Sequence, residues 1–243
     1  MADDKDPSVE AQWARVRARL RKEVGETAYR SWIKPLTLLG VEGGDARLGA
    51  TTRFVRDWVR SHYADLIRVL DHVLTPKDML VLDAGNNRIW VTSMLRLRTP
   101  GQLVAPGGIG GMGWGLPAAA ATKLVYPDRN PICLIGDGGA AMTLSTLATC
   151  VQEKLPITVI VANNQGLGMV RDNMKGKRIA VDFSPMDFAM LAQGMGCQGI
   201  RVNRADALGD AIVAAREAGR QGITTVIDVA IDPAASHVPA SDY

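Results

Sequence analysis

The sequence predicts an α/β protein in which a doubly wound parallel sheet is preceded by a small N-terminal α/β module. Short apolar strands alternate with helical stretches between residues 79 and 229, which is typical of parallel sheets covered on both faces. Two glycine clusters, over 107–115 and 136–139, fall where such sheets bind ligands, and the second directly follows an expected strand. Residues 1–70 contain few glycines and three of the five tryptophans. We therefore expect two domains, 8–70 and 78–235, that join near residues 71–78.

Composition excludes several classes of protein. The 243 residues are 47% hydrophobic and 22% charged, which is enough apolar material for one or two globular domains. No apolar run approaches the ~18–20 residues of a membrane span, and the first ten residues are too polar for a secretory signal. The three cysteines (Cys133, Cys150 and Cys197) are far apart in apolar segments, and three histidines argue against a zinc enzyme. We expect a cytoplasmic protein without membrane association.

A helix is expected at the start of the N-terminal module. Trp13, Val16, Leu20 and Val24 recur at spacings of three or four residues, which indicates an amphipathic helix. The basic run over 15–22 belongs to this helix and is most simply a solvated face. Because no aromatic pattern accompanies it, we expect no direct contact with nucleic acid.

The rest of the module reads as a helix, a hairpin and a long helix. The second helix covers about 26–33 and ends before Pro35. Strands at Leu36–Val41 and Ala46–Thr51 flank a Glu-Gly-Gly-Asp turn. Thr52 can cap the last helix. The apolar stripe of that helix comprises Phe54, Val55, Trp58, Val59, Leu66, Ile67 and Leu70.

Residues 8–70 resemble the N-terminal domain of the bacterial replication initiator DnaA. The resemblance is carried by Trp13, by the SWIKPL segment over 31–36 and by the RFVRDWV segment over 53–59. It implies a module that self-associates through Trp13 and contacts a partner through Phe54, with core packing as the alternative for both. The acidic helicase contact of that family corresponds to Ala28 here, so contact with a helicase is the weaker expectation. Neither a phosphate-binding loop nor a helix-turn-helix follows, so the chain is not a complete initiator.

Four strands and four helices are expected in the second domain. The strands are Met79–Leu82, Ile132–Ile135, Ile157–Ala162 and Thr224–Val229. The helices lie near 116–126, 140–152, 185–195 and 206–219. The first glycine cluster, 107–115, contains a G-x-G-x-x-G at Gly108, Gly110 and Gly113. Pro106 and Gly107 precede it instead of a clear strand, and no acidic residue ends a strand about 20 residues later, so the pattern does not favour a dinucleotide site.

The second glycine cluster indicates a diphosphate clamp. Asp137 ends one apolar strand and is followed by Gly138 and Gly139, and Asn164 ends the next strand. Adjacent parallel strands bring their carboxyl ends to one edge, where a carboxylate, an amide oxygen and a carbonyl form a hard oxygen set suited to Mg²⁺. The glycines let backbone N–H groups approach an anion at the start of the following helix. Ordinary turn chemistry is the alternative reading of Asp137 and Asn164.

The second domain resembles the C-terminal, diphosphate-binding domain of the acetolactate synthase-like thiamin-diphosphate enzymes over roughly 78–231. The paired motif is Gly136-Asp137-Gly138 with Asn163-Asn164. The companion motifs are Asp83-Ala-Gly-Asn86, Gly110-Gly-Met-Gly113, Gly115-Leu-Pro-Ala118 and Gly166-Leu-Gly-Met-Val-Arg171. The resemblance therefore implies the thiamin-diphosphate-binding fold, with thiamin diphosphate and Mg²⁺ as cofactors.

The resemblance also implies roles for individual residues. Asp137 and Asn164 would bind Mg²⁺ through their side chains, and Gly166 would bind it through its carbonyl. The diphosphate would accept hydrogen bonds from the N–H groups of Gly138, Gly139 and Ala140.

Other residues would contact the organic part of the cofactor or the far side of the diphosphate. Met112 would wedge the cofactor into a bent shape, with simple core packing as the alternative. The Gly110 carbonyl would hold the 4′-amino group, and Met169 would lie beside the thiazolium. Asn86 and Asn87 stand where acetolactate synthases place a Gln-His pair on the diphosphate.

What the chain lacks shapes the expected function. Enzymes of this family need an activating glutamate on a separate pyrimidine-binding domain, and nothing in residues 1–77 resembles that domain. We therefore expect no catalytic residue in this chain, which would be half of a 2-oxo acid decarboxylase or carboligase, inactive alone. A pyrimidine-domain subunit or a homologous chain would complete it in an oligomer. Two alternatives stay open: a non-catalytic interaction module built on the DnaA-like domain, and a chimera without a joint function.

Overall fold

The computed structural model describes residues 13–18, 21, 36–42, 45–50, 62–174 and 177–231. The chain divides into two compact units, Met1–Arg60 and Ser61–Tyr243, and each is described by itself. The predicted domain bounds of 8–70 and 78–235 stay predictions. None of the helices in the described ranges is long and apolar enough to cross a membrane.

The first unit contains a helical segment and a hairpin. Residues 13–18 are helical, and the Arg17 guanidinium lies 5.9 Å from the centre of the half-buried Trp13 ring. Strands β1 (Leu36–Glu42) and β2 (Asp45–Ala50) pair antiparallel, with Glu42 opposite Asp45 beside the turn, so the predicted hairpin is confirmed. The expected helix over 26–33, including Ala28, and the predicted contact Phe54 lie outside the described residues.

The second unit is built on a six-stranded sheet with the order β4-β3-β5-β6-β8-β7, in which every neighbouring pair is parallel. Its strands are β3 (Asp78–Leu82), β4 (Leu103–Val104), β5 (Asn130–Gly136), β6 (Thr158–Asn163), β7 (Gln198–Val202) and β8 (Thr225–Ala230). The four predicted strands are confirmed as β3, β5, β6 and β8. The edge strands β4 and β7 were not predicted.

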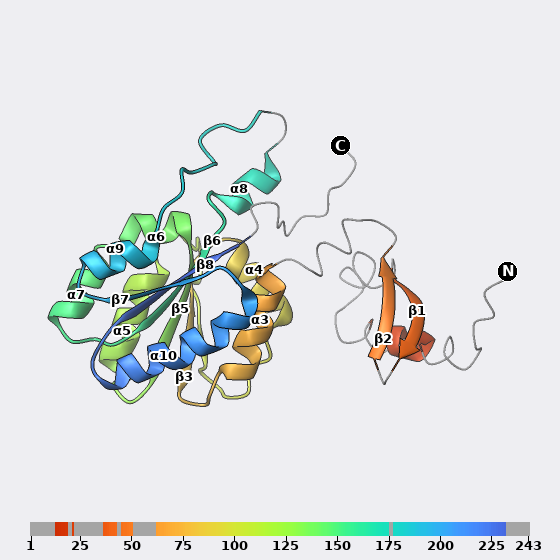
Figure 1. Ribbon diagram of the computed structural model, residues 1–243, viewed down its shortest axis with the longest axis horizontal. Helices are drawn as coiled ribbons and strands as arrows, with labels where there is room; N and C mark the ends of the chain where they lie inside the picture. Colours follow the sequence, from red (N-terminus) through yellow and green to blue (C-terminus); the bar gives the residue numbers. More distant parts are fainter. Residues whose placement is uncertain are drawn as a thin grey trace. The chain divides into compact units, whose positions relative to one another are not determined.

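Helices cover both faces of this sheet (Figure 1). They are α3 (His62–Val73), α4 (Asn86–Met94), α5 (Gly115–Val125), α6 (Asp137–Thr143), α7 (Thr146–Gln152), α8 (Gly168–Asn173), α9 (Phe188–Gly194) and α10 (Leu208–Arg220), with a short 3-10 turn at Ala205–Ala207. The predicted helix over 140–152 is two helices, α6 and α7. Helices α4 and α8 were not predicted.

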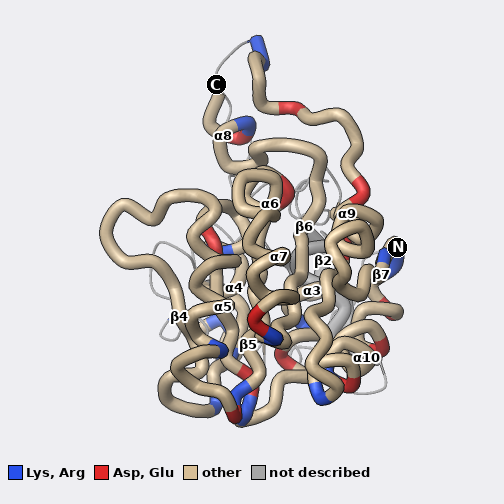
Figure 2. The backbone as a smooth tube through the Cα atoms, turned by 90° about the vertical axis from the view of Figure 1, so that its left-hand side faces the viewer, with Lys and Arg blue, Asp and Glu red and all other residues tan. Residues whose placement is uncertain are grey.

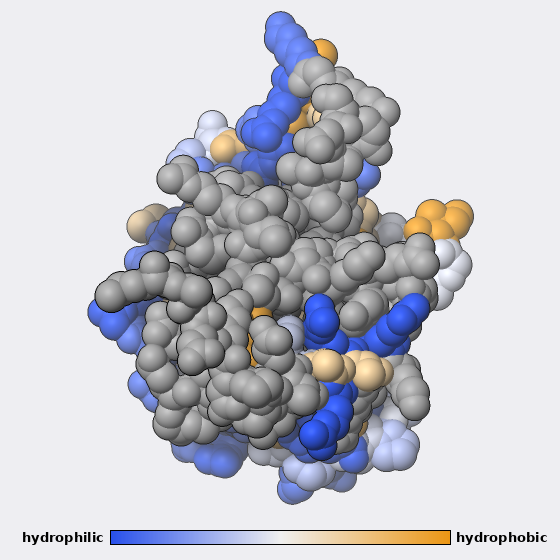
Figure 3. All heavy atoms as spheres, turned by 90° about the vertical axis from the view of Figure 1, so that its right-hand side faces the viewer, coloured by the Kyte–Doolittle hydropathy of each residue, from blue (hydrophilic) through white to orange (hydrophobic). Residues whose placement is uncertain are grey.

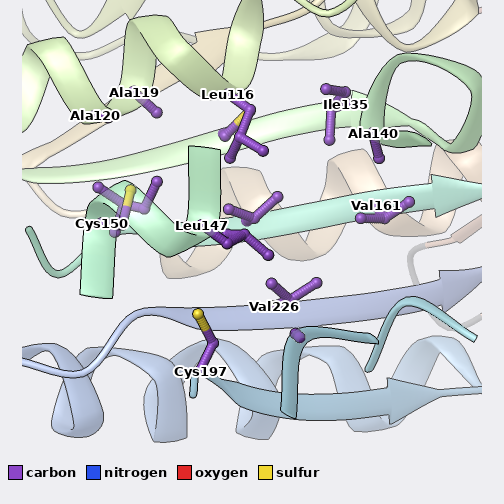
Figure 4. Packing of buried hydrophobic residues seen from close by; sticks show 14 of the residues in the cluster. Leu116, Ala119, Ala120, Ile135, Ala140, Leu147, Cys150, Val161, Cys197 and Val226 are labelled. Atoms are coloured by element: carbon purple, nitrogen blue, oxygen red, sulfur yellow. The ribbon is translucent and has the colours of Figure 1, made fainter. Parts of the chain in front are cut away.

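The strands alternate their buried side chains between two apolar layers, as the two-residue period of a strand requires. Val81, Cys133 and Ile135 point to the layer beneath α5, α6, α7 and α9. Leu80 and Leu134 alternate with them and are also fully buried. Figure 4 shows the first layer, in which Cys150 of α7 and Cys197 pack among aliphatic side chains. All three cysteines are free and buried, as the sequence predicts.

Helix α3 belongs to the second unit. Its Leu66, Ile67 and Leu70 are at most 1% exposed, and the helix packs against α4 and α10. The sequence assigned these residues to the apolar stripe of the N-terminal module, because periodicity reveals a buried face but not the partner that buries it. The division between the units falls between Arg60 and Ser61.

A buried ion pair ties α10 to the amino end of β3. The Asp78 carboxylate is fully buried, and its Oδ2 accepts hydrogen bonds from Arg216 Nη2 at 2.6 Å and from the Thr75 N–H at 2.6 Å. Its Oδ1 accepts from Asn130 Nδ2 at 3.2 Å. One carboxylate therefore joins α10, β5 and the turn after α3.

We expect Asp78→Ala to lower the free energy of unfolding by about 3 kcal/mol, since it leaves Arg216 without its buried counter-ion. Urea denaturation followed by circular dichroism measures this. The control is Arg220→Ala, which removes the exposed Arg220–Glu217 pair from the same helix and should leave the midpoint unchanged. Equal midpoints for Asp78→Ala and wild type would show that the pair contributes nothing.

Candidate functional site

A cavity of about 200 Å³ lies at the carboxyl ends of β3, β5 and β6. Strands β5 and β6 pair directly, with Gly136 opposite Ala162, so the residues that follow them share one edge of the sheet. The lining comprises Ala84, Gly85, Asn86, Asn87, Gly110, Met112, Gly136, Asp137, Gly138, Gly139, Asn164, Gly166, Leu167, Gly168, Met169 and Val170. Every site residue predicted from the sequence lines this cavity except Ala140, whose side chain is fully buried in the core.

Asp137 is the buried carboxylate of the cavity. It is 2% exposed, its Oδ1 accepts from the Gly138 N–H at 2.8 Å, and its Oδ2 accepts from the Gly166 N–H at 2.9 Å. Burial raises the pKa of Asp137, while these amide donors and the charge of Arg171 act in the opposite direction. The Gly166 contact joins the turn after β5 to the turn after β6.

Two neutral oxygens accompany this carboxylate. Asn164 is 3% exposed, and its side chain makes no hydrogen bond within the described part of the chain. Among the described residues, the Gly166 carbonyl accepts only the Gly168 N–H, at 3.0 Å, and retains a second lone pair. Across the described ranges, no group of three or more His, Cys, Asp or Glu could hold a metal ion. A cation here would therefore depend on one carboxylate, neutral oxygens and a ligand's own oxygens.

A side-chain network fixes the strand end that carries Asn164. Asn163 Nδ2 donates to Asp228 Oδ1 and to the Met186 carbonyl, both at 3.0 Å. Asp228 Oδ2 accepts from the Phe188 N–H and from Arg201 Nη1, both at 3.1 Å. Burial raises the pKa of Asp228. The hydrogen bonds of the Asn163 side chain are thus used within the fold, and Asn164 is the asparagine of this pair whose side chain faces the cavity.

The side chains of the two asparagines at the start of α4 use only part of their hydrogen-bonding capacity. Asn87 Nδ2 donates to the Leu134 carbonyl at 3.0 Å, and Asn86 Nδ2 donates to Asp172 Oδ2 at 3.0 Å. Asn86 is 4% exposed, yet its Oδ1 has no hydrogen-bond partner among the described residues. A buried polar atom without a partner costs about 1–3 kcal/mol, so a donor supplied by a ligand or by water would stabilise this side of the cavity.

Asp83 is a residue whose role the sequence did not indicate. It follows β3, is fully buried, and accepts the N–H groups of Gly113 at 3.0 Å and Gly115 at 2.9 Å. These bonds hold the loop that carries Gly110 and Met112. An Asp-Ala-Gly run reads as a turn in a sequence, and nothing local reveals partners 30 and 32 residues away.

Several glycines of the lining leave no room for a side chain. A Cβ on Gly138 would lie 2.7 Å from a methyl carbon of Leu167, and one on Gly166 would lie 2.4 Å from the Val181 carbonyl oxygen. A Cβ on Gly139 would lie 2.2 Å from Asp83 Oδ2. The wall of the cavity at these positions is therefore bare backbone, which lets N–H and carbonyl groups approach a ligand closely.

We expect Gly139→Ala to destabilise the protein by about 1–3 kcal/mol, because the new methyl group must displace the hydrogen-bonded Asp83 carboxylate. Helix propensity alone would favour alanine within α6. Gly194→Ala in α9 is the matched control, since a Cβ there meets nothing within 4 Å and should stabilise by about 0.4–1 kcal/mol. Urea midpoints of the two variants should shift in opposite directions. A higher urea midpoint for Gly139→Ala than for wild type would contradict the close packing at Gly139.

The segment that contains α8 projects from the sheet beside the cavity (Figure 1). Its base is closed by an antiparallel bridge between Gly166 and Asp182 and by the pair of Arg171 Nη1 with Asp182 Oδ1, at 3.1 Å. Figure 2 shows charges of both signs along this segment, and Figure 3 shows hydrophilic side chains on it. Met169 and Val170 reach the cavity from α8, which places the base of the segment in the wall of the site.

Comparison with known proteins gives a consistent result. The family model described as "Thiamine pyrophosphate enzyme, C-terminal TPP binding domain" matches residues 83–229, and the DnaA N-terminal domain model matches residues 10–71. Both resemblances seen in the sequence are thereby confirmed.

Individual relatives match the same part of the chain. The acetolactate synthase large subunit of Buchnera aphidicola is 32% identical over 71% of this chain and 31% of its own length. The pyruvate oxidase of Lactiplantibacillus plantarum is 33% identical over 60% of this chain and 25% of its own length. The chain thus spans less than a third of these curated relatives.

A solved structure shares the fold. The thiamine diphosphate-dependent 4-hydroxybenzoylformate decarboxylase of Rhodococcus jostii RHA1 superposes with a TM-score of 0.66 and 30% identity, covering 72% of this chain and 33% of that one. The predicted α/β fold with a parallel sheet is confirmed. The chain therefore belongs to the thiamine pyrophosphate enzyme family, through a C-terminal TPP binding domain.

Proposed function

We propose that the second unit binds thiamin diphosphate together with Mg²⁺ and forms half of the active site of a cytoplasmic 2-oxo acid decarboxylase or carboligase. One observation carries the proposal: a single cavity brings the Asp137 carboxylate and the Asn164 amide together with the Gly166 carbonyl and a wall of bare glycine backbone. This is a hard oxygen set beside a surface that a diphosphate can approach.

The residues present fit such a cofactor. Asn86 has a buried oxygen without a partner at the cavity, and the Asn164 side chain makes no hydrogen bond to the described residues. Side chains at Gly138, Gly139, Gly166 or Gly168 would fill the space or displace its walls. The lining residues that the structure describes include one carboxylate and no lysine, arginine or histidine, so a diphosphate would need a cation to offset its charge.

Each residue then has a proposed task. Asp137, Asn164 and Gly166 would hold Mg²⁺, and the backbone of Gly138 and Gly139 would face the diphosphate. Met112, which is 38% exposed, and Met169 would contact the organic part, and the Gly110 carbonyl would hold the amino group. Thiamin diphosphate, when bound, supplies the carbon nucleophile for 2-oxo acid chemistry. Of the remaining predicted residues, Asn86 and Asn87 would face the diphosphate, and Ala140 would act only through its backbone.

The proposal includes a partner. The lining contains no glutamate or histidine, so the chain's described residues offer no proton-transfer group at the cavity other than Asp137, which would be engaged by the cation. We propose that a pyrimidine-domain subunit or a homologous chain supplies the activating glutamate in an oligomer. The half-exposed Met112 is the side chain that such a partner would cover.

Titration calorimetry of the whole chain with thiamin diphosphate tests the proposal. Binding should require Mg²⁺, and EDTA should abolish it. Equal binding with and without Mg²⁺ would contradict the clamp. No binding under any condition would favour the alternative of a non-catalytic module, in which the domain serves the DnaA-like unit as a scaffold.

A further inference from the structure

We propose that Asp83 is a positioning residue that couples the loop carrying Gly110 and Met112 to the turn after β5, and thereby sets where Met112 stands in the cavity. The inference rests on the proposed function for its effect on cofactor affinity. Asp83 itself does not line the cavity, so any influence on a bound cofactor passes through the groups that it holds.

The Asp83 carboxylate anchors the loop at two points. Its Oδ2 accepts the Gly113 N–H at 3.0 Å, and its Oδ1 accepts the Gly115 N–H at 2.9 Å. The carboxylate is fully buried, so both oxygens are used where water does not compete, and hydrogen bonds to an ionised acceptor are about twice as strong as neutral ones. Gly113 has a φ of +81°, a backbone conformation that the two bonds help to fix.

Two neighbouring glycines leave the space that the Asp83 carboxylate fills. A Cβ on Gly139 would lie 2.2 Å from Asp83 Oδ2, and a Cβ on Gly115 would lie 2.9 Å from Asp83 Cβ. Gly139 belongs to the turn that carries Asp137, and Gly115 begins α5. The carboxylate therefore fills the space between two segments whose glycines have no side chains to compete for it.

Met112 connects this anchor to the cavity. It immediately precedes Gly113, and its terminal methyl carbon lies 3.0 Å from the position that a Cβ on Gly138 would take. The Met112 side chain thus reaches the turn after β5 from a loop that Asp83 holds in place. Loss of either Asp83 hydrogen bond would free the backbone next to Met112 without changing any atom that lines the cavity.

The variant that tests this is Asp83→Asn, which preserves size but must turn its NH₂ group toward one of the two amides. Hydrogen exchange over residues 108–116 should become faster, and the Kd for thiamin diphosphate at saturating Mg²⁺ should rise about 10–100-fold. In a Met112→Ala background, Asp83→Asn should have a much smaller effect on the Kd. On a logarithmic scale, the rise should be less than half of the rise that Asp83→Asn causes in wild type, because the group that Asp83 positions is already absent.

Asp78→Asn is the matched control. Asp78 is an equally buried carboxylate at the opposite end of β3, bonded to groups remote from the cavity. Asp78→Asn should lower the melting temperature and leave the Kd for thiamin diphosphate unchanged. In the double variant with Met112→Ala, the changes in melting temperature and in the logarithm of the Kd should equal the sums of the single effects.

Two results would overturn the inference. If Asp83→Asn behaves as Asp78→Asn does, with lower stability and an unchanged Kd, Asp83 is only structural. If exchange over residues 108–116 is unaltered by Asp83→Asn, the carboxylate does not hold the loop. The exchange measurement needs no cofactor. It therefore tests whether Asp83 holds the loop even if wild type fails to bind thiamin diphosphate and the proposed function is wrong.

Discussion

Asp137→Ala should abolish Mg²⁺-dependent binding of thiamin diphosphate, with an affinity at least about 100-fold below that of wild type. Substitutions of groups that merely support a metal ligand cost about 10–100-fold, and Asp137 would be the only charged ligand. The neutral oxygens of Asn164 and Gly166 would remain, but they cannot offset the charge of a dication next to a diphosphate. Titration calorimetry with and without Mg²⁺ measures the effect.

The variant also removes the acceptor of two buried amides, those of Gly138 and Gly166. A second variant, Asp137→Asn, keeps an oxygen for one of them and should bind equally weakly, which separates charge from folding. Asp210→Ala, which removes an exposed carboxylate from α10, should bind as wild type does. Wild-type affinity in Asp137→Asn would show that the carboxylate charge does not hold the cation.

The purified chain alone should turn over 2-oxo acids no faster than the background. The part of the cavity lining that the structure describes contains no glutamate, and general acid–base assistance is worth about 10²–10⁴-fold. Met112 is 38% exposed, so a reacting centre beside it would also face water instead of a closed pocket. The assay supplies pyruvate and related 2-oxo acids with thiamin diphosphate and Mg²⁺, and follows release of CO₂.

Activity should emerge when the chain is mixed with a pyrimidine-domain subunit. Met112→Ala should lower that activity, and Asp137→Ala should return it to the background. Robust turnover by the 243-residue chain alone would mean that a base within the chain serves the reaction, and residues 1–60 would then be the place to look for it.

The sequence predicted the central strands because parallel strands buried on both faces read as continuous apolar runs. It missed β4, which has two residues, and β7, whose run of Gln198 to Val202 contains a glycine and an arginine. The helices α6 and α7 were merged because the break near Leu144 and Ser145 carries neither glycine nor proline.

In the candidate site, too, the sequence predicted some residues and missed others. Asp137 and Asn164 could be predicted because each directly follows a strand, and neighbouring parallel strands end at one edge. Asp83 could not, because its importance lies in amides of a loop that only the folded chain brings to it. Helix α3 was correctly predicted to be amphipathic, but its partners α4 and α10 are set by tertiary packing.

The three buried cysteines make thiol labelling a measure of how often the second unit opens. Burial raises the pKa of Cys150 to about 11, and burial also raises the pKa values of Cys133 and Cys197. Only the thiolate reacts with alkylating or disulfide reagents, so the raised pKa values slow the reaction at neutral pH, and all three side chains are buried in the folded state. A reagent added to the native chain will therefore modify these cysteines only through the openings that expose them, and a cysteine introduced on the surface will be labelled first.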